Sequence, residues 1–250
     1  IYTSLFVGSV RCVKETAIEP EGGTTNLTIG MTGQNVVIGG SGGIKANTYK
    51  DAGGTTLWTS NGSGTLSSVS GFGGAQVLIS SQTASNSASI SFTSGIDSTY
   101  KEYVFEFVDI NPATDDMEFT FQVNAVSGSG YNETITSTYF YALHDEGDSQ
   151  TGLTYGTADD QAQGTAFQAV ADAIGNGADE CCAGELHIFN PSSTTYVKNF
   201  YSRVQMYHAS NMSVERFAAG YINITAAIDE IQFKMTSGNF DGTIKMYGIK

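Results

Sequence analysis

Residues 117–125 alternate strictly between apolar and polar side chains. The odd positions hold Met, Phe, Phe, Val and Ala, and the even positions hold Glu, Thr, Gln and Asn. Successive side chains of a β-strand point to opposite faces, whereas a helix brings every third or fourth residue to one face. The pattern therefore predicts a strand with one apolar and one polar face.

Further strand patterns follow along the rest of the chain. Tyr103–Val108 carries apolar groups on both faces, as a strand buried on both sides would. Shorter apolar segments predict strands at 76–80, 88–93, 139–143, 185–189, 196–207, 216–224, 230–235 and 242–249. About ten strands joined by short connections favour an antiparallel, jelly-roll-like β-sandwich over residues 75–250. The one exception is Thr157–Gly175, where apolar residues at roughly helical spacing predict a short helix.

Residues 1–74 differ in composition and in hydrophobic pattern from the predicted sandwich. From about residue 20 they consist of short apolar pairs set among Gly, Ser, Thr and Asn, with repeated turn signals. Such segments bury little apolar surface against themselves, so they need to stack on copies from other chains. We therefore predict an all-β chain with a Gly-rich, intertwined, homo-oligomeric β stalk at 1–74 and a separate head at 75–250.

The charge balance excludes several classes of partner. The chain has 25 acidic and 11 basic residues, which gives a net charge of −14. Nucleic-acid binding and polybasic membrane contact both need clustered Lys and Arg, so neither is expected. No apolar run approaches the roughly 20 residues that span a bilayer. The three cysteines include an adjacent pair, Cys181 and Cys182, which favours free thiols over a disulfide framework.

An acidic cluster follows the predicted strand at 139–143. It contains His144, Asp145, Glu146 and Asp148. Loops rich in carboxylate oxygens can bind Ca²⁺, but the EF-hand order of ligands is missing here. A solvated acidic loop and direct contact with a receptor are the other readings, and we expect no metal or cofactor.

Two patterns that could indicate catalysis are weak. Asp115, Asp116 and Glu118 could supply a glycosidase carboxylate pair, although adjacent carboxylates are common on an acidic protein. Gly39–Gly43 matches G-x-S-x-G, but the residues after it are not helical, as a nucleophile elbow requires. We therefore expect that the protein is not an enzyme.

Tyrosine and asparagine side chains at loops and on outward faces suggest sugar contacts. A ring face packs on C–H groups while an amide bonds to hydroxyls. The predicted receptor-binding residues are accordingly Tyr131, Asn132 and Tyr155 together with the cluster at 144–148, and Tyr201 and Tyr207 show the same character. Each of these tyrosines could instead line the sandwich or a subunit interface.

The chain resembles the distal part of a tail fibre from a tailed phage of the marine type. The resemblance lies in the shaft GIKANTYKDAGGTTLWTSNGSGTLSSV at 43–69, in SFTSGIDSTY at 91–100 followed by YVFEF, and in GTIKMYGIK at 242–250. It implies a homotrimeric virion protein that binds a host surface receptor or glycan through its tip and contacts other tail proteins. No residue-level binding motif transfers. The alternatives are a capsid decoration or cement protein and a polysaccharide-depolymerising tailspike.

Overall fold

The computed structural model describes residues 48–50, 53, 55–60, 66–67 and 75–250. The chain divides into two units after Ser70. In the first unit, β1 (Thr48–Lys50), β2 (Thr56–Ser60) and β3 (Leu66–Ser67) pair in that order as a small antiparallel sheet. Most of the predicted stalk, including the Gly39–Gly43 motif and Cys12, lies outside the described residues.

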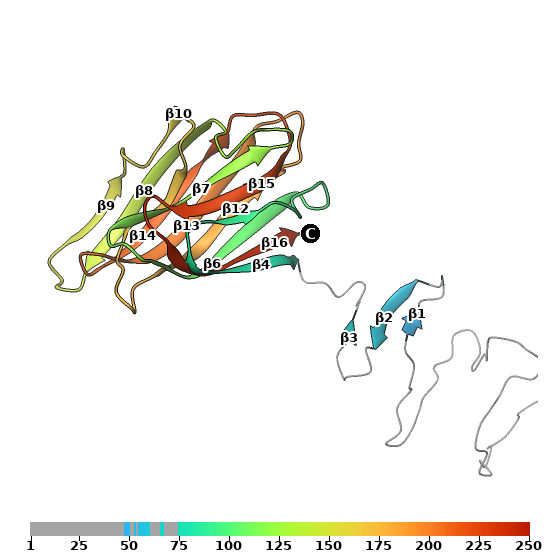
Figure 1. Cartoon of the computed structure of the whole chain (residues 1–250), viewed down its shortest axis with the longest axis horizontal. Helices are drawn as coiled ribbons and strands as arrows, with labels where there is room; N and C mark the ends of the chain where they lie inside the picture. Colours follow the sequence, from blue (N-terminus) through green and yellow to red (C-terminus); the bar gives the residue numbers. More distant parts are fainter. Residues whose placement is uncertain (1–47, 51–52, 54, 61–65, 68–74) are drawn as a thin grey trace, which may run out of the picture. The chain divides into compact units, whose positions relative to one another are not determined.

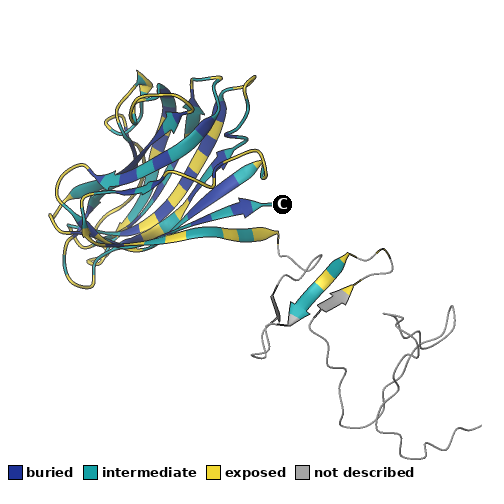
Figure 2. Cartoon of the chain, turned by 45° about the vertical axis from the view of Figure 1, so that its right-hand side comes forward, coloured by how far each residue is buried: buried dark blue, intermediate teal, exposed yellow. Residues whose placement is uncertain are grey.

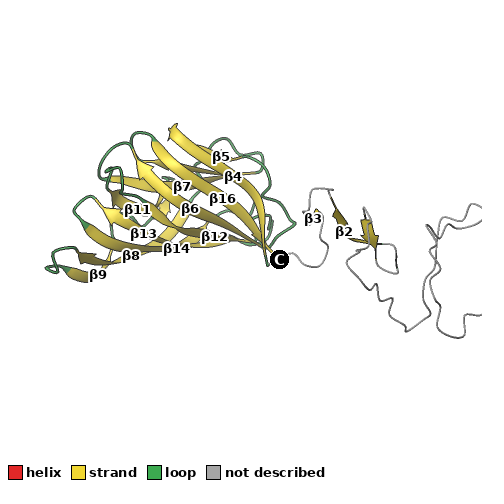
Figure 3. Cartoon of the chain, turned by 90° about the horizontal axis from the view of Figure 1, so that it is seen from below, coloured by secondary structure: helices red, strands yellow, loops and turns green. Residues whose placement is uncertain are grey.

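The second unit is an antiparallel β structure, so the all-β prediction is confirmed (Figure 3). Its strands are β4 (Gln76–Ser87), β5 (Ile90–Phe92), β6 (Glu102–Pro112), β7 (Met117–Ala125), β8 (Ile135–Asp145), β9 (Thr151–Tyr155), β10 (Ala162–Gly164), β11 (Gln168–Ile174), β12 (Cys182–Phe189), β13 (Lys198–His208), β14 (Met212–Ile222), β15 (Ile228–Met235) and β16 (Phe240–Ile249). The described part of the chain contains no helix that could cross a membrane.

The strands form two runs (Figure 1). The longer run has the order β4-β16-β6-β12-β13-β14-β8, and both β9 and β10 pair with β8. The shorter run has the order β5-β15-β7-β11. The two runs meet where Ile174 of β11 pairs with His208 of β13. The result is a β-sandwich whose two layers are joined along the side where β11 meets β13.

Phenylalanine rings from both runs fill the space between them. The Phe233 ring of β15 lies at the centre, with its centroid 5.4 Å from that of Phe105, 5.3 Å from Phe107 and 5.9 Å from Phe119. All four side chains are at most 1% exposed. Because β6 and β7 belong to different runs, these contacts join the two layers. Buried and exposed residues alternate along many strands around this core (Figure 2).

The predicted strands are present, but the predicted helix at 157–175 is wrong. This segment forms β10 and β11 instead. The pairing of β11 with β7 shifts register between Ala169 and Ala171 and again before Ile174. Because each β-bulge adds an unpaired residue, the period of two is lost. Residues 168–171 are also buried on both sides, so their apolar positions imitate helical spacing.

We predict that Phe233→Ala lowers the free energy of unfolding by about 3–5 kcal/mol, because it leaves a ring-sized cavity between the layers. Urea titration followed by circular dichroism measures this change. Tyr196→Ala is the matched control, since the Tyr196 side chain is 70% exposed and should change stability little. Equal losses in both variants would contradict the central role of Phe233.

Candidate binding face

Alternate residues of the longer run point away from the core and line up across neighbouring strands. Phe140 of β8 pairs with Phe217 of β14, and Phe217 pairs with Arg203 of β13. Arg203 in turn pairs with Glu185 of β12, which pairs with Glu106 of β6. Directly opposed residues in a sheet project to the same side. These five side chains therefore form one row on the outer surface. We call this row, together with Tyr155 beside Phe140 and with His187 and Tyr201 in the adjacent row, the binding face.

One end of the row is aromatic and exposed. The rings of Phe140 and Phe217 stack with centroids 4.8 Å apart and an interplanar angle of 9°. Tyr155 of β9 pairs with Phe140, and these two side chains are 49% and 41% exposed. The Arg203 guanidinium lies 5.8 Å from the Phe217 centroid. Flat apolar rings and a cation are thus presented together to solvent.

A second aromatic pair lies in the adjacent row. The rings of His187 and Tyr201 stack with centroids 4.4 Å apart. A contact of 2.6 Å between His187 Nδ1 and Glu102 Oε1 fixes the imidazole, and Tyr201 remains 40% exposed. The outward position predicted for Tyr201 is therefore confirmed.

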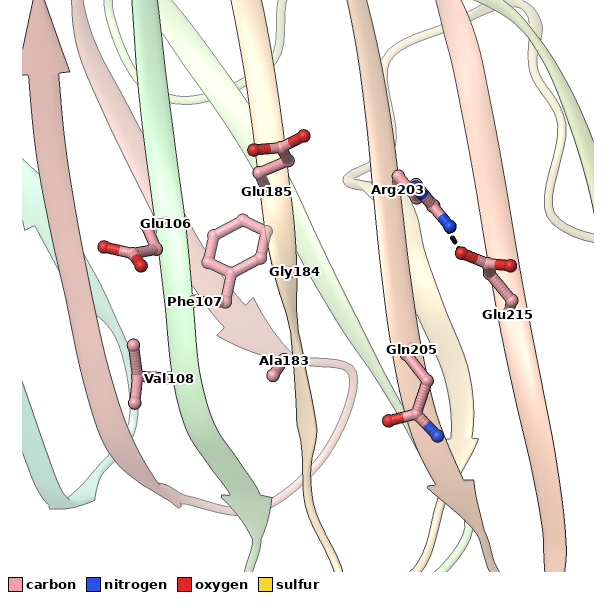
Figure 4. A pocket seen from close by; sticks show the side chains of 9 residues that line it. All are labelled: Glu106, Phe107, Val108, Ala183, Gly184, Glu185, Arg203, Gln205 and Glu215. Atoms are coloured by element: carbon pink, nitrogen blue, oxygen red, sulfur yellow. Dashed lines mark hydrogen bonds and ion pairs between the residues drawn. The ribbon is translucent and has the colours of Figure 1, made fainter. Parts of the chain in front are cut away.

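An open hollow of about 500 Å³ lies over β6, β12, β13 and β14, at the ionic part of the row (Figure 4). Its walls carry ionic and amide groups, and its floor includes Ala183 and Gly184. A Cβ at position 184 would lie 2.2 Å from the carbonyl oxygen of Arg203, so β12 and β13 approach too closely here for any other residue. The complete lining is Glu106, Phe107, Val108, Ala183, Gly184, Glu185, Arg203, Gln205 and Glu215.

The carboxylates of the hollow have different partners. Arg203 Nε donates to Glu215 Oε1, and this hydrogen bond raises the pKa of Arg203. Glu106 Oε2 accepts from Lys245 Nζ at 3.3 Å and from Tyr247 Oη at 3.1 Å. Glu185 Oε1 lies 3.4 Å from His187 Nε2, which forms no hydrogen bond. The face can thus offer both donors and acceptors to a polar ligand.

The predicted receptor-binding residues do not form one site. His144, Asp145 and Glu146 line a smaller hollow of about 190 Å³ beside β13, where Tyr207 Oη donates to Glu146 at 3.0 Å. Asp148 Oδ1 lies 3.3 Å from His144 Nε2. No three His, Cys, Asp or Glu side chains gather to hold a metal ion in the described part of the chain.

Asp145 serves the turn between β8 and β9. Its carboxylate accepts from Ser149 Oγ and from the backbone N–H groups of Ser149 and Gln150. These hydrogen bonds lower the pKa of the Asp145 carboxyl group, and the bond from the Ser149 side chain has the largest effect. Most of its acceptor capacity is therefore used within the turn.

The other three predicted residues lie elsewhere. Tyr131 and Asn132 occupy the β7–β8 loop, at the opposite end of the 11-residue β8 from His144, which is roughly 35 Å at the usual rise of a strand. Tyr155 Oη donates to Asp160 at 2.7 Å, and its ring belongs to the binding face. The alternation within 139–143, 185–189, 196–207 and 216–224 is the signal that could have identified the other outward residues of the face, whereas most of the predicted residues lie outside these segments.

A third hollow, of about 370 Å³, lies where residues 158–167 cover the polar side of β7 and β15. Glu118 and Asp159 both line it, whereas Asp115 and Asp116 do not. Burial raises the pKa of Asp159 to about 6, with a further contribution from Asp172 and an opposing one from Arg216. Asp172 contacts Nη2 of Arg216, whose side chain is only 4% exposed. Glu118 therefore meets Asp159 rather than the neighbouring carboxylates of the sequence.

We predict that Asp159→Asn stabilises the head above about pH 6 relative to wild type. The folded-state pKa is raised from 3.8 to about 6, so the contribution of this group is full below about pH 4 and is lost as the pH rises through about 6. Melting temperatures across this pH range measure the effect, with the exposed Asp179→Asn as control. An Asp159→Asn curve parallel to that of wild type would show that burial does not hold the proton.

Comparison of the chain with protein-family models, with curated proteins and with solved structures found no match.

Proposed function

We propose that the chain is the receptor-binding part of a tailed-phage tail fibre, and that its head adsorbs the virion to a host surface glycan through the binding face. The observation that carries this proposal is the row of outward side chains from Phe140 to Glu106, with the exposed Tyr201 in the adjacent row. Aromatic rings pack against the C–H faces of sugars, and charged and amide groups bond to hydroxyls.

The shape of the face suits an extended ligand. The row crosses β8, β14, β13, β12 and β6, and the hollow opens to solvent along it. An open face removes less ligand surface from water than an enclosed pocket, so each contact is weak. A homotrimer presents three copies, whose weak affinities combine through effective concentration. The proposed binding is non-covalent and needs no cofactor.

The strand order supports the proposed architecture. From the orders β4-β16-β6-β12 and β5-β15-β7-β11 we infer a jelly roll of two four-stranded sheets, in which β8–β10 and β13–β14 are insertions that extend one sheet. The inserted strands carry Phe140, Phe217 and Tyr201. We infer that these insertions adapt a virion-type sandwich to adhesion, with residues 1–74 as the trimeric stalk that leads to other tail proteins.

A depolymerising tailspike is the second candidate, because Glu118 and Asp159 share one hollow and burial raises the pKa of both carboxyl groups. It would release reducing sugar from host polysaccharide, and Glu118→Gln would abolish this release. A capsid decoration protein would instead bind virus particles but not cells.

We predict that Tyr201→Ala weakens adsorption to host cells or their isolated polysaccharide by about fivefold per site, since a lost ring contact is worth about 1 kcal/mol. Biolayer interferometry on immobilised polysaccharide measures the change. Tyr196→Ala removes the same side chain from the β12–β13 loop, outside the face, and should bind normally. Equal loss in both variants, or in neither, would contradict binding through the face.

We predict that the native protein has three times the mass of the 250-residue chain, which is 26.4 kDa, because the stalk sequence needs sister strands to bury its apolar pairs. Light scattering at several concentrations, before and after denaturation, gives the mass of the native protein and the mass of the denatured chain. One chain mass under native conditions would remove the trimer from the proposal.

A further inference from the structure

The three carboxylates of the hollow differ in whether a cation neutralises them. Glu215 accepts from Arg203, and Glu106 accepts from Lys245. Among the described residues, Glu185 has no Lys or Arg ion-pair partner, and its contact is with His187. Arg203 attracts Glu185 electrostatically, but its Nε is committed to Glu215. One carboxylate of the face therefore remains available to a ligand.

Glu185 also stands where a bound sugar would reach it. It lies between Arg203 and Glu106 in the row, and its contact at 3.4 Å places it beside His187, which stacks on Tyr201. Its side chain is 48% exposed. A sugar ring packed on Tyr201 would thus carry a substituent toward the Glu185 carboxylate.

We propose that the binding face selects glycans that carry free amino groups, with Glu185 accepting the ammonium group, and discriminates against glycans that carry carboxylate or sulfate groups. This inference rests on the proposed glycan-binding function and names its ligand class. A protonated amine would donate a charge-assisted hydrogen bond to the Glu185 carboxylate, which has no Lys or Arg partner among the described residues.

An anionic glycan would be repelled by the acidic lining of the hollow. The lining carries three glutamates against the single Arg203, whose Nε bonds to Glu215. A uronate or sulfate would approach the unpaired carboxylate of Glu185 as a like charge, and such juxtaposition works against the wrong partner. The net charge of −14 adds a long-range repulsion of the same sign.

The test uses the 250-residue chain and three oligosaccharides of matched length: oligoglucosamine, its N-acetylated neutral counterpart and an oligouronate. Titration calorimetry at a mildly acidic pH, at which the amines are protonated, gives the affinities. We expect oligoglucosamine to bind about fivefold more tightly than the neutral oligomer, as one exposed ion pair allows, and the oligouronate to bind most weakly.

Two variants separate a specific contact from general attraction to an acidic protein. Glu185→Gln keeps the shape of the side chain and should equalise the amine-bearing and neutral oligomers. Asp179→Asn removes the same charge from the exposed β11–β12 loop and should preserve the preference. Oligouronate binding as tight as that of oligoglucosamine, or a preference unchanged in Glu185→Gln, would overturn this inference alone. Binding of none of the three would contradict the proposed function itself.

Discussion

The unbroken register of β13, β14 and β8 is the constraint on which the head depends. Each strand has 11 residues, and the pairing of β14 with both neighbours runs without a bulge. A shift of one residue would turn every inward side chain outward. Val204 and Val214, at most 1% exposed, therefore fix the outward direction of Arg203 and Glu215. The same strand register therefore decides which side chains pack in the core and which ones form the binding face.

Buried polar groups behave differently from those on the binding face. Lys198 is fully buried, and its ammonium donates to the carbonyl oxygens of Tyr196, Ile224 and Ala226. This cation thereby ties the β12–β13 loop to the segment before β15. Gln122 likewise donates to three carbonyl groups, at Glu133, Thr165 and Ala166. Such groups are satisfied by the backbone, so they position loops and have little capacity left for a ligand.

The sequence predicted much of the fold because alternation is a local property. The bounds of β7 follow directly from the period of two at 117–125, and β13 of the longer run shows the same alternation. The pattern failed at β11, where two register shifts and burial on both sides removed it. It also hid the burial of Thr120 and Gln122, because the segment that covers them, at 158–168, is distant in sequence.

The site was harder to predict than the fold for a related reason. A row such as Phe140, Phe217 and Arg203 joins residues far apart in the chain, and only the cross-strand register brings them together. Tyr131 and His144 both looked like loop residues in the sequence, yet His144 belongs to β8 and Tyr131 lies beyond the opposite end of that strand. An open sheet face offers rings and charges without enclosing a ligand. In the proposed function, discrimination between ligands would therefore come from the charges around Glu185, and occupancy would come from the number of copies in the predicted homotrimer.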